Sequence, residues 1–217
     1  MTPALQTRSP AARLYLVVPG ADDASELART LDHALETAAI AAVLLHLPDG
    51  GERTQIDYIK AITPAVQEKD IALLLDGHAD LVARAGADGA HLNGIEALTD
   101  ALTTLKPDRI TGGGGLRTRH DAMLAAERGA DYVMFGDPDG RRPAFDQIVE
   151  RVAWWAELFE IPCVAWAESL DEVAPLAGAG ADFVALGPFV FADLAAASTI
   201  IGAATERLAQ APARSGS

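Results

Sequence analysis

The sequence has one cysteine, a shortage of positive charge and no long apolar run, and each of these features removes a class of protein. Cys163 is the only cysteine among 217 residues, which excludes a disulfide framework and a cysteine metal cluster. The 17 basic residues against 31 acidic ones give a net charge of -14, and such a chain repels a nucleic-acid backbone. We therefore expect no nucleic-acid partner.

The chain also lacks the segments that take proteins to or through a membrane. No run reaches the roughly eighteen apolar residues of a membrane span, and residues 1–13 lack the apolar stretch of a signal peptide. We expect a cytoplasmic protein with no membrane partner. Residues 1–11 and 211–217 are rich in small and polar residues, so they are expected to be flexible tails around a single domain of residues 12–210.

Short apolar segments alternate along the chain with longer amphipathic ones. The apolar segments are hydrophobic on both faces, as parallel strands covered by helices require. The expected strands are residues 13–18, 40–47, 71–76, 89–92, 109–113, 131–136, 162–167 and 182–187. The expected helices are residues 23–37, 53–68, 78–85, 95–104, 118–128, 144–158, 169–178 and 191–210. This strict alternation favours a closed (β/α)8 TIM barrel, with a doubly wound open sheet as the alternative.

The phrase Gly-Ala-Asp recurs immediately before three of the expected strands. It stands at residues 86–88, 129–131 and 180–182, where each copy ends a helix and leads into strand four, six or eight. The glycine suits a left-handed helix cap and the aspartate suits a turn. The regular spacing supports a closed barrel. Because barrel active sites lie at the opposite ends of the strands, we expect the three aspartates to be structural.

The residues that follow the strands form the rim where a barrel carries its active site. Histidines, carboxylates and arginines gather in these segments. Four of the arginines follow the neighbouring strands five and six, so their charges are expected to converge on one side of the mouth. They are Arg117, Arg119, Arg141 and Arg142. We expect this side to bind a small anionic molecule.

Several phrases resemble the thiamine phosphate synthase family and its thiazole tautomerase relatives. They are LYLVV, LLLDGHADLVARAGADGAHLN, ERGADYVMFG and AGADFVALG, in that order, between residues 13 and 205. The resemblance implies a (β/α)8 barrel that joins a pyrimidine diphosphate to a thiazole phosphate, with Mg²⁺ neutralising the departing diphosphate. A small phosphorylated heterocycle is the implied ligand.

The resemblance is weaker where the family binds the diphosphate and the metal. After strand two, Leu44, His46 and Pro48 replace the family's Gln-x-Arg-x-Lys pattern. Of the family's two metal carboxylates, the first corresponds to Asp76, displaced by one position, and the second to Glu96. Two carboxylates and several waters can complete the octahedral shell of Mg²⁺. The resemblance therefore implies a metal site at Asp76 and Glu96.

The stretch TGGGGLRTR after strand five also departs from the family pattern. Gly113, Gly115 and Arg117 stand where the family has glycine, serine and histidine, so the histidine that tautomerases use for proton transfer is absent. Two interpretations stay open. The stretch is either a main-chain cradle for an anion or a loop left over from a lost catalytic site. The binding candidates here are Gly113, Gly114, Gly115 and Arg117.

A base for proton transfer has to come from another position on the rim. His46, Asp76 and His78 follow strands two and three and are the catalytic candidates. The two histidines are alternatively solvated rim residues. His91 matches a family histidine for which we favour a structural role.

The expected phosphate contacts after strands six and seven are changed as well. Arg141 or Arg142 stands near a family lysine that contacts the leaving diphosphate. Ala167 and Glu168 replace a Gly-Gly pair whose amides bind the thiazole phosphate, and a carboxylate there repels a phosphate. Together with Gly187 after strand eight, Arg141, Arg142 and Glu168 complete the substrate-binding candidates.

The scaffold phrases are kept while the residues for chemistry are changed, and this leaves two hypotheses. The first is a thiamine phosphate synthase-like transferase with altered catalytic positions. The second is a catalytically degenerate paralogue that binds a small anionic or phosphorylated ligand or a protein partner. Trp154 and Trp155 either cover the barrel or form a subunit interface, so a homo-oligomer stays open.

Overall fold

The computed structural model describes residues 11–36, 39–137 and 142–212, and in them eight parallel strands form a closed ring. The strands are β1 (Arg13–Val18), β2 (Ile40–Leu45), β3 (Ala72–Asp76), β4 (Gly89–Asn93), β5 (Ile110–Gly114), β6 (Tyr132–Phe135), β7 (Cys163–Ala167) and β8 (Phe183–Leu186). They pair in chain order, and β8 pairs with β1. The ring confirms the (β/α)8 barrel and excludes the open sheet.

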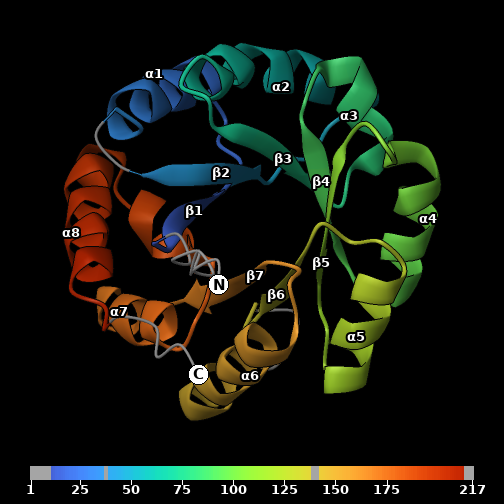
Figure 1. Ribbon diagram of the computed structural model, residues 1–217. Coiled ribbons are helices and arrows are strands. Elements are labelled where there is room, and N and C mark those ends of the chain that lie inside the picture. The colour runs from blue at the N-terminus through green and yellow to red at the C-terminus, as the bar shows by residue number, and fades with distance from the viewer. Residues whose placement is uncertain (1–10, 37–38, 138–141, 213–217) are drawn as a thin grey trace, which may run out of the picture.

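The helices lie outside the ring of strands (Figure 1). They are α1 (Ala24–Ala34), α2 (Glu52–Gln67), α3 (Ala79–Ala85), α4 (Ile95–Leu105), α5 (Arg119–Glu127), α6 (Phe145–Leu158), α7 (Leu170–Gly178) and α8 (Ala197–Ala209). The helix predicted at 191–210 begins later than expected. Two short 3-10 turns, η1 (Pro188–Phe191) and η2 (Leu194–Ala196), precede it. The Asp193 carboxylate accepts the Ala195 N–H at 3.0 Å. This hydrogen bond caps η2, so the segment forms a separate 3-10 turn before α8 begins.

Helix α1 illustrates how local sequence sets an element of this barrel. The Asp23 carboxylate accepts the Ser25 N–H at 2.8 Å, so a side chain satisfies an N–H group that the first turn leaves unpaired. Leu27, Leu31 and Leu35 recur on one face and are buried against the sheet. The cap starts the helix, and the apolar stripe attaches it to the barrel.

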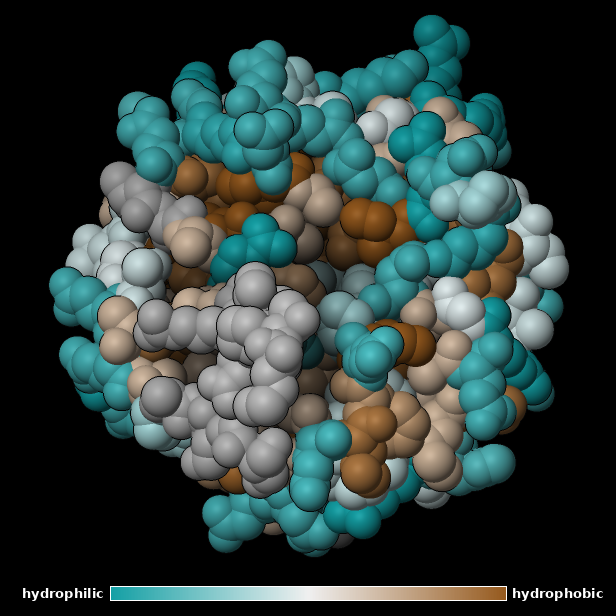
Figure 2. Space-filling model, in the orientation of Figure 1, coloured by the Kyte–Doolittle hydropathy of each residue, from teal (hydrophilic) through white to brown (hydrophobic). Residues whose placement is uncertain are grey.

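Strand β1 shows why the barrel strands are apolar on both faces. Leu14, Leu16 and Val18 belong to the hydrophobic layer between the strands and the helices. Tyr15 and Val17 point the other way, into the separate core that fills the barrel. In the view of Figure 2, hydrophilic side chains lie along the upper edge, and hydrophobic side chains are seen just inside them.

The glycine run of β5 provides room for two rings inside the barrel. A Cβ atom added to Gly112 would lie 1.9 Å from Tyr132 Cζ, and one added to Gly114 would lie 2.3 Å from His91 Nε2. Gly113 faces the opposite way, towards the helices. The strand was predicted to end at residue 113, but Gly114 still pairs with Asn93 of β4. Residues 112–114 are therefore strand rather than loop.

The aspartates of the Gly-Ala-Asp repeats are structural, as predicted. Each carboxylate accepts a hydrogen bond from a main-chain N–H near the start of the preceding strand. The pairs are Asp88 with Leu73 at 2.8 Å, Asp131 with Thr111 at 2.7 Å, and Asp182 with Cys163 at 2.9 Å. The repeat thus ties each even-numbered strand from β4 to β8 to its odd-numbered neighbour at the end of the barrel opposite to the rim.

Replacing Asp88 with alanine is expected to lower the free energy of unfolding by about 1–3 kcal/mol, because the Leu73 N–H loses a charged acceptor. The Gln67 side chain, which donates to the same carboxylate at 2.9 Å, loses its acceptor too. Urea unfolding at pH 7 measures the change. The control is Asp171→Ala, which removes an exposed carboxylate with one ion pair at 3.5 Å and is expected to change stability by less than about 1 kcal/mol. Equal losses in both variants would contradict the structural role of the repeat.

Trp154 and Trp155 of α6 differ in their surroundings. Trp155 is fully buried, stacks on Phe159 with ring centroids 4.1 Å apart, and donates its Nε1–H to the Ile161 carbonyl at 2.7 Å. Trp154 is half-buried, and the Arg119 guanidinium lies 4.7 Å from its ring centroid. Trp155 covers the barrel, so the interface alternative is wrong for this residue. The oligomeric state stays a prediction.

The two predicted tails lie mostly in residues 1–10 and 213–217, outside the described part of the chain. At the C-terminal end Ala211 is partly buried against the core, although it was predicted to begin a tail. Among the described residues no helix is both long enough and apolar enough to cross a membrane.

Candidate functional site

Three of the predicted catalytic residues come together where β2 and β3 end. His46 Nδ1 lies 3.4 Å from Asp76 Oδ2, and both side chains are partly exposed. Burial raises the pKa of the Asp76 carboxyl, while the neighbouring His46 and His78 act on it in the opposite direction. His78 is the residue that precedes α3. The structure therefore groups His46, Asp76 and His78 on one side of the mouth.

A buried chain of hydrogen bonds lies inside the barrel. Tyr132 Oη is 3.0 Å from His91 Nδ1 and 2.9 Å from Tyr15 Oη. Burial lowers the pKa of His91 to about 4, so its ring is neutral at pH 7. Burial likewise raises the pKa of both tyrosines. His91 is thus a packed neutral residue, which agrees with the structural role predicted for it.

The predicted metal carboxylates occupy different surroundings. Asp76 is partly buried beside His46, whereas Glu96 is exposed in the first turn of α4. The described parts of the chain contain no group of three histidine, cysteine, aspartate or glutamate side chains that could hold a metal ion. Mg²⁺ commonly takes one or two carboxylates and completes its shell with waters and substrate phosphates. The described residues therefore include no closed metal site, and the metal role of Asp76 and Glu96 stays a prediction.

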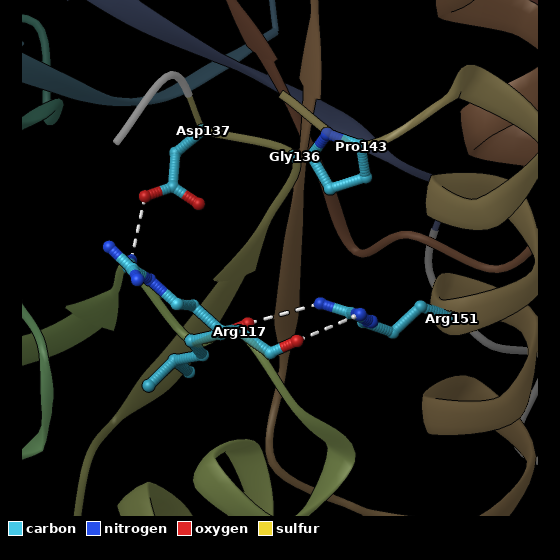
Figure 3. Close-up of a pocket in the computed structure, with 7 residues that line it drawn as sticks. Arg117, Gly136, Asp137, Pro143 and Arg151 are labelled. Carbon is cyan, nitrogen blue, oxygen red and sulfur yellow. Dashed lines mark hydrogen bonds between the residues drawn. The ribbon is translucent and has the colours of Figure 1, made fainter. Parts of the chain in front are cut away.

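A cleft of about 310 Å³ opens between the segments that follow β5 and β6 (Figure 3). Its lining combines a glycine turn, a carboxylate and two arginines. The lining residues are Gly115, Leu116, Arg117, Gly136, Asp137, Pro143 and Arg151. The cleft lies at the carboxyl ends of the strands, where barrels bind their ligands.

The loop on one side of this cleft is held by two sets of hydrogen bonds. The Asp137 carboxylate accepts the Gly115 N–H at 2.7 Å, and Gly115 has a φ of 63°, which suits glycine. From α6, the Arg151 guanidinium donates to the carbonyls of Leu116 at 3.0 Å and Arg117 at 3.1 Å (Figure 3). The main chain of the loop is therefore fixed, and the Gly115 amide already has an anionic partner.

Arg117 is one of the two arginines that line the cleft. Its guanidinium is exposed and takes part in none of the ion pairs found among the described residues. Arg119 instead lies over Trp154 and pairs with Glu150 at 2.8 Å. Arg141 lies outside the described residues. The expected convergence of four arginines is thus wrong for Arg119.

Arg142 is held by two carboxylates between β6 and α7. Its guanidinium lies 2.7 Å from Glu172 Oε2 and 3.4 Å from Glu168 Oε2, and it also donates to the Trp166 carbonyl at 3.3 Å. Within the described part of the chain its buried Nε has no hydrogen-bond partner. The Glu172 carboxylate accepts the Glu168 N–H at 2.8 Å as well. Arg142, predicted as a phosphate ligand, therefore already has anionic partners.

The other glycines predicted to bind phosphate lie in or beside the strand ladder. Gly113 and Gly114 belong to β5, and the Gly187 N–H donates to the Ala167 carbonyl at 3.1 Å. Gly115 and Arg117 are the predicted residues that line the cleft. The binding roles of all five stay predictions.

Glu172 and Arg151 are site residues that the sequence analysis missed. Ser169 and Glu172 have the Ser-x-x-Glu spacing of a helix N-terminus, which indicates a carboxylate folded back over the start of α7. No local pattern marks Arg151, because its partners are 34 and 35 positions away along the chain.

The fold and this mouth define a (β/α)8 barrel protein whose charged residues and cleft lie at the carboxyl ends of the strands, where barrels bind and convert small molecules. Residues 14–190 match the model of the family described as Thiamine monophosphate synthase. The chain belongs to this family.

Sequence similarity to thiamine-phosphate synthases supports this family assignment. The thiamine-phosphate synthase of Rhodospirillum centenum is 39% identical over 179 residues, which cover 80% of this chain and 86% of the relative. That of Hyphomonas neptunium is 34% identical over 206 residues, which cover 88% and 90% of the two chains. A solved thiamine phosphate pyrophosphorylase from Pyrococcus furiosus has a TM-score of 0.75 and 20% identity, covering 91% of this chain and 96% of its own. The last likeness supports the fold alone.

Proposed function

We propose that this protein is a transferase of the thiamine phosphate synthase type. In this reaction a pyrimidinylmethyl group leaves its diphosphate and joins the ring nitrogen of a thiazole. Similarity to thiamine-phosphate synthases over the whole barrel supports the proposal. The observation that carries it is the cleft between the β5 and β6 segments, because it is lined by Arg117, which is exposed and forms no ion pair with any of the described residues.

The bond changes need little covalent help from the protein. The methylene C–O bond breaks and its electron pair leaves with the diphosphate, while the lone pair of the thiazole nitrogen forms the new C–N bond. Negative charge grows on the departing diphosphate, so a nearby guanidinium stabilises the transition state. We assign this role to Arg117, whose main chain Arg151 holds in place.

The cluster on the other side of the mouth has a supporting role in this proposal. His46 and His78 donate hydrogen bonds to the diphosphate, and the 3.4 Å contact with Asp76 orients the His46 ring. Asp76 and Glu96 are the carboxylates that would hold Mg²⁺. When bound there, the ion would offset the charge of the leaving diphosphate.

Replacing Arg117 with alanine is expected to lower kcat/KM for thiamine phosphate formation about 10- to 100-fold, because the leaving group loses a charged partner. The assay combines purified protein, pyrimidine diphosphate, an acceptor thiazole and Mg²⁺. The acceptor is supplied both as the phosphate ester and as the free alcohol. The control is Arg119→Ala, because Arg119 pairs with Glu150 and lies over Trp154 instead of lining the cleft.

Two results would contradict these assignments. Unchanged turnover in Arg117→Ala would remove the role of Arg117. No product from the unaltered protein with either acceptor, together with no Mg²⁺-dependent binding of the diphosphate, would overturn the transferase proposal.

The second candidate function is a degenerate paralogue that binds a small anion without turnover. The observation that favours it is the pairing of the Gly115 and Glu168 amides with carboxylates of the chain itself. Such a protein is expected to be stabilised against heat by phosphate, pyrophosphate or a sugar phosphate while forming no product. Thermal shift measurements with these anions, beside the transferase assay, separate the two functions.

A further inference from the structure

Arg142 joins the segment that follows β6 to the neighbouring β7–α7 unit. Its guanidinium donates to Glu172 Oε2 at 2.7 Å, to Glu172 Oε1 at 3.3 Å and to the Trp166 carbonyl at 3.3 Å. The side chains of Arg142 and Glu172 are only 17% and 18% exposed, so water screens the pair weakly. A two-pronged contact between guanidinium and carboxylate fixes the orientation of the guanidinium as well as its position.

Glu172 is itself held in place on the barrel. It lies in the first turn of α7, where the helix dipole favours a carboxylate. The same carboxylate accepts the Glu168 N–H at 2.8 Å, and the next residue, Val173, is fully buried. Arg142 is therefore attached to a fixed point of the neighbouring βα unit.

The residue after Arg142 lines the cleft that contains Arg117. Pro143 and Arg117 both line this cleft, from the segments after β6 and β5 (Figure 3). The proline ring fixes its own φ at about -65° and restricts the residue before it, so few torsions are free between Arg142 and the Pro143 ring. On the β5 side, Arg151 and Asp137 hold the main chain. The attachment of Arg142 thus sets where Pro143 stands relative to Arg117.

We infer that Arg142 is a positioning residue and that Glu172 is its partner. Together they hold Pro143 at the distance from Arg117 that an anion in the cleft requires. This inference rests on the proposed function, in which Arg117 contacts the diphosphate. The competing interpretation is that Arg142 leaves the carboxylates and contacts the diphosphate itself.

The two interpretations predict opposite effects when the ion pair is weakened. If Arg142 positions Pro143, a weaker pair loosens the side of the cleft and lowers the affinity for an anion. If Arg142 is a ligand for the anion, a weaker pair releases its charge and raises that affinity. The sign of the change therefore distinguishes a positioning residue from a binding residue.

Glu172→Gln is the variant that weakens the pair, because it keeps an oxygen for the Glu168 N–H and loses the charge that binds Arg142. Calorimetry measures the Kd of inorganic pyrophosphate with Mg²⁺, and turnover gives KM and kcat for the pyrimidine diphosphate. We expect both Kd and KM to rise about 5- to 10-fold while kcat changes less than about twofold. The control is Asp171→Asn, which removes a neighbouring carboxylate that is 86% exposed and is expected to leave all three values unchanged.

Hydrogen exchange gives a second readout that needs no ligand. The Gln147 and Ile148 N–H groups at the start of α6 donate to the Ala144 carbonyl at 2.9 and 3.2 Å. In Glu172→Gln these amides are expected to exchange at least about 5-fold faster, because the segment that leads into α6 has lost its attachment. Exchange in α2 is expected to stay unchanged, as is exchange at all of these amides in Asp171→Asn.

Each outcome of these measurements decides one question. Tighter pyrophosphate binding by Glu172→Gln overturns the positioning role and supports a ligand role for Arg142. Unchanged binding together with unchanged exchange also overturns the positioning role. If the unaltered protein neither binds pyrophosphate nor forms product, the proposed function fails, and exchange at Gln147 and Ile148 alone decides whether Arg142 and Glu172 hold this segment.

Arg142→Lys replaces the first variant if Glu172→Gln does not fold. Lysine keeps the positive charge but cannot make the two-pronged contact with Glu172 and the bond to the Trp166 carbonyl at once. A positioning role predicts that pyrophosphate binding weakens about 5-fold or more in this variant. Retained binding would mean that the charge of residue 142, not its attachment, matters to the anion.

Discussion

Gly112→Ala is expected to destabilise the barrel by about 3 kcal/mol or more, at the upper end of what overpacking of a core costs. The added Cβ would lie 1.9 Å from Tyr132 Cζ and 2.3 Å from its hydroxyl oxygen. The ring has little freedom to move away, because Tyr132 is buried and bonded to both Tyr15 and His91. Either the strand or this chain of hydrogen bonds must be distorted.

Urea unfolding followed by circular dichroism measures this loss. The control is Gly202→Ala, since no atom lies within 4 Å of the added Cβ and the residue is inside α8. There alanine is expected to stabilise the helix by about 0.5–1 kcal/mol. The double variant Gly112→Ala/Tyr132→Ala removes the clashing ring, so its two changes are expected to cost less than the sum of the single changes. A loss below about 1 kcal/mol in Gly112→Ala would show that the packing around Tyr132 is not tight.

The fold was predictable because its signals are local and repeat along the chain. Apolar strands, amphipathic helices and the Gly-Ala-Asp phrase each depend on residues within one βα unit, and together they specify a ring. The glycine run was harder to interpret. Its meaning depends on Tyr132 and His91, which lie about 20 residues away on either side, and a glycine-rich segment looks the same in a loop and in a crowded strand.

The location of the candidate site was predictable, but its ion pairs were not. The rule that barrels act at the carboxyl ends of their strands put His46, Asp76 and His78 on the rim, and in the structure they lie near one another there. Their catalytic roles stay predictions. The rule could not show which arginines form ion pairs with carboxylates of the chain itself. Arg142 meets Glu172 from a distance of 30 residues along the chain, and Arg119 meets Glu150 from 31. Such pairs arise only when neighbouring βα units pack.

These ion pairs change what the net negative charge of the protein implies for anion binding at the rim of the barrel. A net charge of -14 argued against polyanions in general, and the rim arginines argued for a small one. Among the described residues, Arg142 is paired with Glu172 and Glu168 and Arg151 donates to main-chain carbonyls, so Arg117 is the cleft arginine that is in no ion pair there. These carboxylates therefore limit the positive charge that the described part of the rim offers to an anion.

Stability is expected to fall by about 3 kcal/mol as the pH drops from about 6.5 to 4, because of His91. Burial lowers its pKa from 6.5 in the unfolded chain to about 4 in the fold, and each unit of difference corresponds to about 1.4 kcal/mol. Between these values the unfolded chain binds a proton that the folded barrel does not. The contribution is therefore full above pH 6.5, is lost as the pH falls, and changes no further below pH 4.

Asp76 changes the stability with pH in the opposite direction, so its contribution has to be separated from that of His91. Burial raises its pKa above 3.8, so its contribution to stability is present at low pH and is lost as the pH rises through the folded value. A comparison with His91→Asn isolates the histidine, because the variant keeps Asp76 and places an amide near the Nδ1 position that contacts Tyr132. The exposed His120→Asn serves as the control for loss of a histidine.

The measurement is the free energy of urea unfolding at pH 7 and at pH 4.5 for the three proteins. The unaltered protein and His120→Asn are expected to lose stability in parallel between the two pH values. His91→Asn starts lower at pH 7, because its hydrogen bond and packing are imperfect, but is expected to lose about 2–3 kcal/mol less on acidification. Parallel losses in all three proteins would mean that His91 is protonated inside the barrel, and that the Tyr132 hydroxyl accepts a hydrogen bond from a charged ring instead of pairing with a neutral one.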